Sequence, residues 1–111
     1  MICDRFETVV IPFPFAEIPV LKRRPVVVVS AIAHNEANGW TLVSMITSTK
    51  LVEWPSDVRI ADLGPAGLQV PCIVRWRLTS IPNGMIVRRL GKIAGIDRLA
   101  CERSFAAMIL D

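Results

Sequence analysis

The feature that most constrains the fold is a run of four valines within "PVVVVSAI", residues 25–32. β-branched side chains fit an extended strand, and an unbroken apolar run indicates a strand that is covered on both faces. Eight prolines and six glycines divide much of the remaining chain into short segments. Such interruptions disfavour long helices. We therefore expect a mostly β structure built around residues 25–32.

The segments on either side of this run have the composition of partner strands. Residues 8–13, "TVVIPF", read as a first strand that ends at prolines, and 13–23 read as a loop. The dipeptide Asn38-Gly39 is a strong turn signal, so we expect 40–46 to return as the second arm of a hairpin.

The second half of the chain adds shorter strands. Residues 58–62 and 72–81 alternate in polarity, and 85–93 supplies short elements that are broken at a glycine. Strict alternation in 72–81 places one set of side chains on one face and the other set opposite. The first set is Ile73, Arg75 and Arg77, and the second is Cys72, Val74, Trp76 and Leu78.

The carboxy-terminal part differs in kind. From Asp97, a predicted N-cap, residues 98–110 are rich in Ala, Leu and Met and contain neither proline nor glycine, which predicts a helix. Short strands followed by one helix describe a small, bent barrel or sandwich with a helix packed on it. A length of 111 residues fits one domain, 1–111.

The composition indicates the kind of partner, the cellular compartment and the oligomeric state to expect. The net charge is +3, which suits a polyanionic partner. No apolar stretch reaches the roughly 18 residues of a membrane span, and the amino terminus has no apolar run suited to secretion. Three widely spaced cysteines argue against a disulfide framework or a zinc site and for a reducing cytoplasm. A hydrophobic content of 52% in so short a chain indicates a homodimer as well as a tight core.

Three consecutive cations, Lys22, Arg23 and Arg24, stand directly before the valine run. Two interpretations compete. Either they form a solvated loop that discourages pairing of strand edges, or they bind a nucleic-acid backbone. In the second case the rigid strand holds Arg24 in place.

Four blocks of the chain, in order and at normal spacing, resemble the PemK/MazF family of toxins from bacterial toxin–antitoxin pairs. They are "TVVIPFPFAEIPVLKRRPVVVVS" (8–30), "MITS" (45–48), "GLQVPCIVRWRL" (67–78) and "VRRLGKIAGIDRL" (87–99). The resemblance implies an SH3-like barrel with a carboxy-terminal helix, which works as a homodimer. It also implies metal-independent, sequence-specific cleavage of single-stranded RNA, no cofactor, and neutralisation by a cognate antitoxin.

By motif match the resemblance assigns catalytic roles to Arg24, Thr47 and Arg75. A guanidinium offers planar donors that match a phosphate, and a hydroxyl can bind either the phosphate or the attacking 2′-oxygen. We expect further contacts with RNA from neighbouring residues that are cationic, polar or aromatic. These are Lys22, Arg23, Ser48, Trp54 and Arg77.

The chain departs from the family pattern in two places. Phe6 and Glu7 stand where family members usually carry Gly-Asp. Arg77 stands where some members carry an acidic residue, which leaves the general base unassigned. The alternative hypothesis is therefore a non-enzymatic toxin or binding module on the same barrel, either a CcdB-like gyrase inhibitor or a degenerate nuclease.

Overall fold

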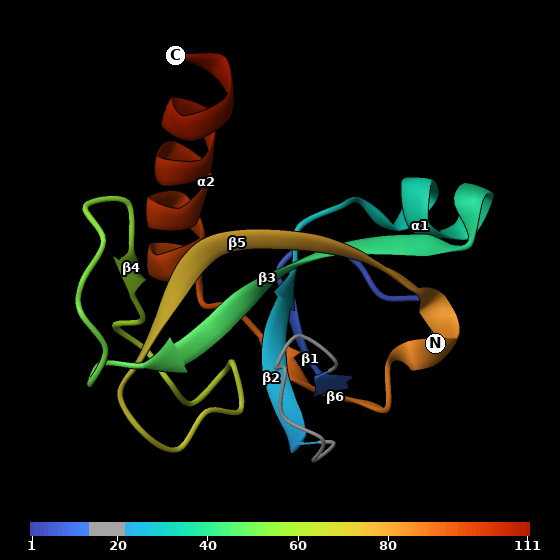
Figure 1. The fold of residues 1–111 in the computed structure, drawn as a ribbon, viewed down its shortest axis with the longest axis horizontal. Coiled ribbons are helices and arrows are strands. Elements are labelled where there is room, and N and C mark those ends of the chain that lie inside the picture. The colour runs from blue at the N-terminus through green and yellow to red at the C-terminus, as the bar shows by residue number, and fades with distance from the viewer. Residues whose placement is uncertain (14–21) are drawn as a thin grey trace.

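The computed structural model describes residues 1–13 and 22–111, and in them six antiparallel strands form one curled sheet beside a carboxy-terminal helix (Figure 1). The strand order is β4-β5-β3-β2-β1-β6. The elements are β1 (Glu7–Phe13), β2 (Lys22–Val28), α1 (Ile32–Asn38), β3 (Trp40–Ser48), β4 (Val58–Arg59), β5 (Cys72–Pro82), the 3-10 turn η1 (Asn83–Met85), β6 (Arg88–Lys92) and α2 (Gly95–Leu110). This confirms the expected fold class. Across the described ranges neither helix combines the length and apolarity that a membrane span needs.

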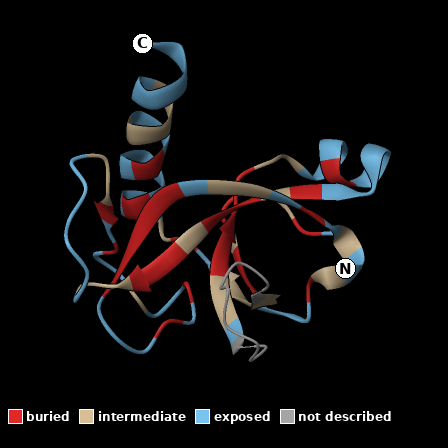
Figure 2. Cartoon of the chain, viewed as in Figure 1, coloured by how far each residue is buried: buried red, intermediate tan, exposed pale blue. Residues whose placement is uncertain are grey.

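Three of the four valines lie in β2 and are covered on both faces, as predicted, but the strand runs from Lys22 to Val28 rather than over 25–32, so the predicted loop 13–23 ends before Lys22. Val27 belongs to a core that also contains Trp76 and Cys101 of α2. Val26 and Val28 belong to a second core, on the opposite face of the sheet. Figure 2 shows buried residues concentrated in the middle of the sheet and at the base of α2. β2 is therefore held rigidly between two apolar layers.

The predicted return of 40–46 as an antiparallel partner of the valine run is confirmed, but the connection is helix α1 rather than a tight hairpin turn. The Asn-Gly signal marks the end of that helix. Gly39 adopts the left-handed conformation, φ 77°, and its N–H donates to the carbonyl of Asn35. A glycine at a helix C-cap and a glycine in a hairpin turn need the same positive φ, so the dipeptide alone does not distinguish them.

The alternation predicted for β5 is confirmed, because Cys72, Val74 and Trp76 lie in one core with Leu78 packed against it, but the strand is not regular. Met45 of β3 pairs with Arg75, but Ser44 pairs with Leu78, so Trp76 and Arg77 form a bulge. The Ser44 hydroxyl donates to the carbonyl of Arg75 at 2.5 Å. Because the bulge adds two residues, it preserves the alternation, and Arg75 and Arg77 both lie on the face of Met45.

Asp97 is not the N-cap of the last helix. Ala94 occupies that position, and α2 begins at Gly95. The buried Asp97 carboxylate instead accepts the backbone N–H groups of Ala61 and Asp62, at 2.7 and 2.9 Å. The strand predicted over 58–62 is accordingly shorter, because those N–H groups bond to α2 rather than to a strand.

One unusual backbone conformation lies at Phe6, where the sequence departs from the pattern of the family that it resembles. Phe6 has a φ of 67°, the left-handed region that favours glycine. Its side chain is only 4% exposed. Phe6 thus buries its aromatic ring while its backbone adopts a conformation that is unfavourable for a residue other than glycine.

Candidate functional site

The pairing of β2 with β3 places Arg24 and Thr47 beyond the same end of the paired segment. Val28 pairs with Val43, and Val26 pairs with Met45. Both strands continue beyond this pair, to Lys22 and Ser48. Arg24 and Thr47 each lie two residues beyond the last pair, Val26 and Met45, and alternation puts them on the face that this pair shares.

The pairing of β3 with β5 brings Arg75 to the same face. Met45 pairs with Arg75, and Thr47 pairs with Ile73. Residues two apart on a strand share a face, so Arg75 is the diagonal neighbour of Thr47, about 7–8 Å away between backbones. The three residues predicted as catalytic thus lie on one face of three neighbouring strands.

These three residues differ in exposure. Thr47 and Arg75 are 8% and 6% exposed, whereas Arg24 is half-buried. Among the predicted RNA contacts, Arg23 and Arg77 are exposed and Ser48 is half-buried. The side chain of Lys22 lies outside what the structure describes.

Arg75 is bound by a carboxylate that sequence reasoning did not identify. Its Nε and Nη2 donate to the two oxygens of Asp57, at 3.0 and 2.7 Å, and Nη2 also donates to the Val52 carbonyl at 2.6 Å. The Asp57 side chain is fully buried. Hydrogen bonds from Arg75 hold the pKa of the Asp57 carboxyl below its ordinary value, and the same bonds raise the pKa of Arg75.

A tight turn between Trp54 and Asp57 positions the Asp57 carboxylate beside Arg75. The Asp57 N–H donates to the Trp54 carbonyl at 3.0 Å, and the Trp54 N–H donates to the Asp57 carboxylate at 2.8 Å. On its other side the turn accepts a bond from Ser104 of α2 to the Ser56 carbonyl. "Trp-Pro-Ser-Asp" has proline at the second turn position and an aspartate able to bond back to the backbone, and this signal was available in the sequence.

Trp54 lies over Arg75. The Arg75 Cζ is 4.5 Å from the centroid of the indole ring, a cation–π contact, and Trp54 remains 41% exposed. Trp76, by contrast, is part of the core. It is 6% exposed, and its Nε1 donates to Ser104 at 2.8 Å.

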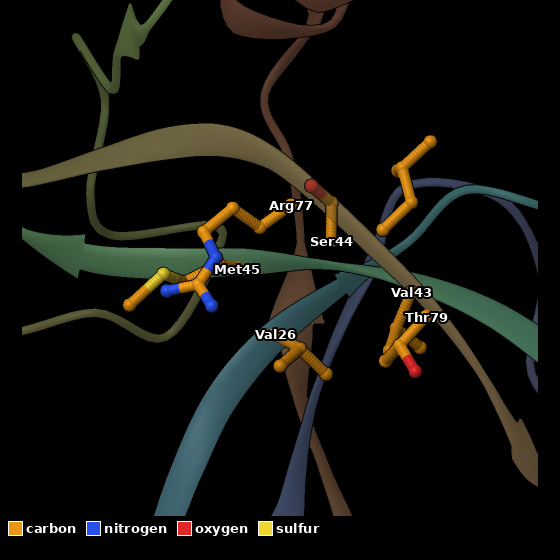
Figure 3. A pocket seen from close by; sticks show the side chains of 7 residues that line it. Val26, Val43, Ser44, Met45, Arg77 and Thr79 are labelled. Atoms are coloured by element: carbon orange, nitrogen blue, oxygen red, sulfur yellow. The ribbon is translucent and has the colours of Figure 1, made fainter. Parts of the chain in front are cut away.

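Arg77 lines a pocket of its own on the bulged part of the sheet (Figure 3). The pocket has a volume of about 70 Å³, and Val26, Val43 and Met45 are among the apolar side chains that line it. Figure 3 shows the guanidinium of Arg77 and the thioether of Met45 at one end and Thr79 at the other. Arg77 is therefore available to a ligand that approaches along β2 and β3.

Comparisons with known proteins agree with this geometry. The family model described as a PemK-like, MazF-like toxin of type II toxin–antitoxin systems matches residues 4–109. Comparison with curated proteins finds no match.

Several solved structures share the fold. MazF from Deinococcus radiodurans superposes with a TM-score of 0.75 at 19% identity, covering 100% of this chain and 99% of that one. The Mycobacterium tuberculosis toxin MazF-mt6 gives 0.72 at 18% identity, with coverages of 91% and 93%. A mycobacterial endoribonuclease in complex with its cognate antitoxin gives 0.74 at 13% identity, with coverages of 95% and 92%. With the family match spanning nearly its whole length, the chain belongs to the PemK-like, MazF-like toxins of type II toxin–antitoxin systems.

Proposed function

We propose that this toxin is an endoribonuclease that cleaves single-stranded RNA at short sequences without a metal ion. The observation that carries the proposal is the register of β2, β3 and β5, by which Arg24, Thr47 and Arg75 share one face. Family membership supports it, as does the likeness in fold to a protein described as an endoribonuclease.

In such a reaction the 2′-hydroxyl of the RNA attacks the adjacent phosphorus, and the 5′-oxygen leaves with a proton. The protein must orient the hydroxyl and stabilise charge on the phosphate oxygens. Arg24 is suited to stabilise the charge on the phosphate oxygens, because the planar donors of its guanidinium match a phosphate. Thr47 can bind the phosphate or the attacking hydroxyl.

Asp57 is the nearest carboxylate to these residues by hydrogen bonding, but it is a poor general base. Both of its oxygens accept bonds from Arg75, and its pKa is lowered. A base with a low pKa takes up a proton weakly near neutral pH. We therefore assign Arg75 and Asp57 to electrostatics and positioning rather than to proton transfer.

The remaining contacts and partners follow from the same proposal. Lys22, Arg23, Ser48, Trp54 and Arg77 contact the RNA outside the scissile bond. The active form is a cytoplasmic homodimer, and a cognate antitoxin neutralises it. The similar proteins whose structures are described as MazE–MazF complexes support the antitoxin.

Incubating the purified protein with a long single-stranded RNA in EDTA tests the proposal. We expect discrete cuts that Arg24→Ala slows by about 10²–10³-fold, the usual loss for one charge-stabilising donor. Arg103→Ala, at an exposed arginine of α2, is the matched control and leaves the rate unchanged. RNA that stays intact, together with inhibition of gyrase supercoiling, would contradict the proposal and favour a CcdB-like inhibitor.

A further inference from the structure

We propose that Asp57 is a positioning residue that holds Arg75 and Trp54 as one stacked unit, and that the outer face of Trp54 binds one unpaired base of the RNA. The unit is named here the Trp54 platform and comprises Trp54, Arg75 and Asp57. The inference rests on the proposed function, since it assigns a base-binding position beside the same site.

The first argument is the geometry of the ion pair. Two parallel bonds, from Nε and Nη2 of Arg75 to the two Asp57 oxygens, fix the plane of the guanidinium as well as its position. The two side chains are 7% and 0% exposed, so little water competes for these bonds. A single charged contact would leave the guanidinium free to rotate.

Asp57 fixes Trp54 in two ways, through the backbone and through the ring. Its backbone is bound in the turn by two hydrogen bonds with Asp57, and its ring lies over the guanidinium that Asp57 orients. Only Asp57 makes both connections among the bonds that the structure gives this turn. Removing the Asp57 carboxylate therefore weakens both the turn that holds the Trp54 backbone and the guanidinium that supports its ring.

The third argument concerns what the platform can bind. One face of the indole lies against Arg75, and Trp54 as a whole is 41% exposed, so the residue keeps surface that a ligand can reach. A phosphate is a poor occupant, because Asp57 neutralises the charge behind the ring. The π-face of an unpaired base is a good occupant, because aromatic side chains stack on every base type.

The Trp54 platform lies beside the proposed cleavage site. Arg75 lies on the face that Thr47 and Arg24 share, so the ring above it stands at the border of the proposed cleavage site. A strand of RNA whose phosphate reaches Arg24 and Thr47 thus places a neighbouring base near Trp54. The platform fixes the register of that strand against the site.

The experiment is an abasic scan. The cut is mapped by sequencing RNA ends, and a 2′-O-methyl RNA of that sequence, which cannot be cleaved, is titrated by fluorescence anisotropy. Each nucleotide in turn is replaced by an abasic unit. In the wild-type protein we expect one position at which removal of the base weakens binding about tenfold.

The variants decide whether Asp57 and Trp54 act on that base. In Trp54→Ala and Asp57→Asn the penalty at this one position disappears, while the rest of the profile is kept. Trp54→Phe restores most of it. Trp40→Ala, at a tryptophan that is 49% exposed at the start of β3, keeps the full profile. A general loss of structure would lower affinity at every position and would not erase a single penalty.

Three results would overturn the inference. A penalty that persists in Asp57→Asn removes the positioning role, and a flat wild-type profile removes the platform, while RNA cleavage itself still stands in both cases. RNA that is neither bound nor cut overturns the proposed function together with the inference. If Asp57→Asn does not fold, Asp57→Glu, which keeps the charge but moves it, decides instead. A reduced penalty supports positioning, and an unchanged one contradicts it.

Discussion

Arg75 and Arg77 are two residues apart on one strand, yet they belong to different regions of the molecule. Arg75 is buried, shares its charge with Asp57 and lies under Trp54. Arg77 is exposed and lines an apolar pocket. Both lie on the face of Met45, and the difference arises because the turn that carries Asp57 and Trp54 covers Arg75, whereas Arg77 is exposed.

The comparison explains how this chain departs from its family. The resemblance leads one to expect a carboxylate two residues after Arg75, where Arg77 stands. In this structure the carboxylate beside Arg75 is Asp57, which comes from a turn before β4 rather than from β5. Arg77 of β5 thus places a positive charge at the surface, while the turn before β4 places the Asp57 carboxylate in the interior.

The largest expected effect on stability comes from breaking the buried pair. Arg75→Met keeps most of the side-chain length but leaves the Asp57 carboxylate buried without its partner. We expect the free energy of unfolding to fall by about 3 kcal/mol, measured by urea denaturation at neutral pH. Arg59→Met breaks the exposed pair with Glu53, 3.8 Å apart, and should cost less than about 1 kcal/mol. Equal losses in the two variants would remove the contrast between buried and exposed pairs.

A smaller effect is expected from acid. The pKa of Asp57 in the folded protein lies below its ordinary value of 3.8, so the folded state binds fewer protons there than the unfolded state. The stability that the carboxylate contributes is present above that ordinary value and is lost as pH falls through the folded pKa. The free energies of unfolding of the wild type and Asp57→Asn should therefore converge below about pH 4. Curves that stay parallel into acid would contradict this.

The smallest effect on stability is expected at Arg77. Arg77→Ala removes an exposed side chain and should change the free energy of unfolding by less than about 0.5 kcal/mol. Its RNA affinity should fall, and the slope of log affinity against log salt should decrease by about 0.7, as for one lost phosphate contact on a single strand. Arg103→Ala should leave that slope unchanged. An unchanged slope in Arg77→Ala would place this arginine outside the RNA path.

The sequence predicted those parts of the fold and site that depend on local composition. The valine run, the carboxy-terminal helix and the positions of Arg24 and Thr47 at strand ends follow from β-branched content, helix propensity and motif. Helix α1 was missed because Gly39 satisfies a helix end and a hairpin turn equally well.

The bulge and the Arg75–Asp57 pair could not be predicted in the same way. Both depend on tertiary contacts between segments far apart in the chain, such as the Ser44 bond to the Arg75 carbonyl and the Ser104 bond that anchors the turn before Asp57. Local patterns carry no information about which distant group will satisfy a given backbone atom.

The central claim is that Arg24 of β2 and Thr47 of β3, on one face of the sheet, act on the same phosphodiester. The most direct test is the rate of RNA cleavage in EDTA by Arg24→Ala, Thr47→Ala and the double variant. Residues that act as a unit are strongly non-additive, so we expect each single variant to lose about 10²–10³-fold and the double variant to lose little more. Losses that multiply in the double variant, or a single variant that cleaves as fast as the wild type, would contradict the account.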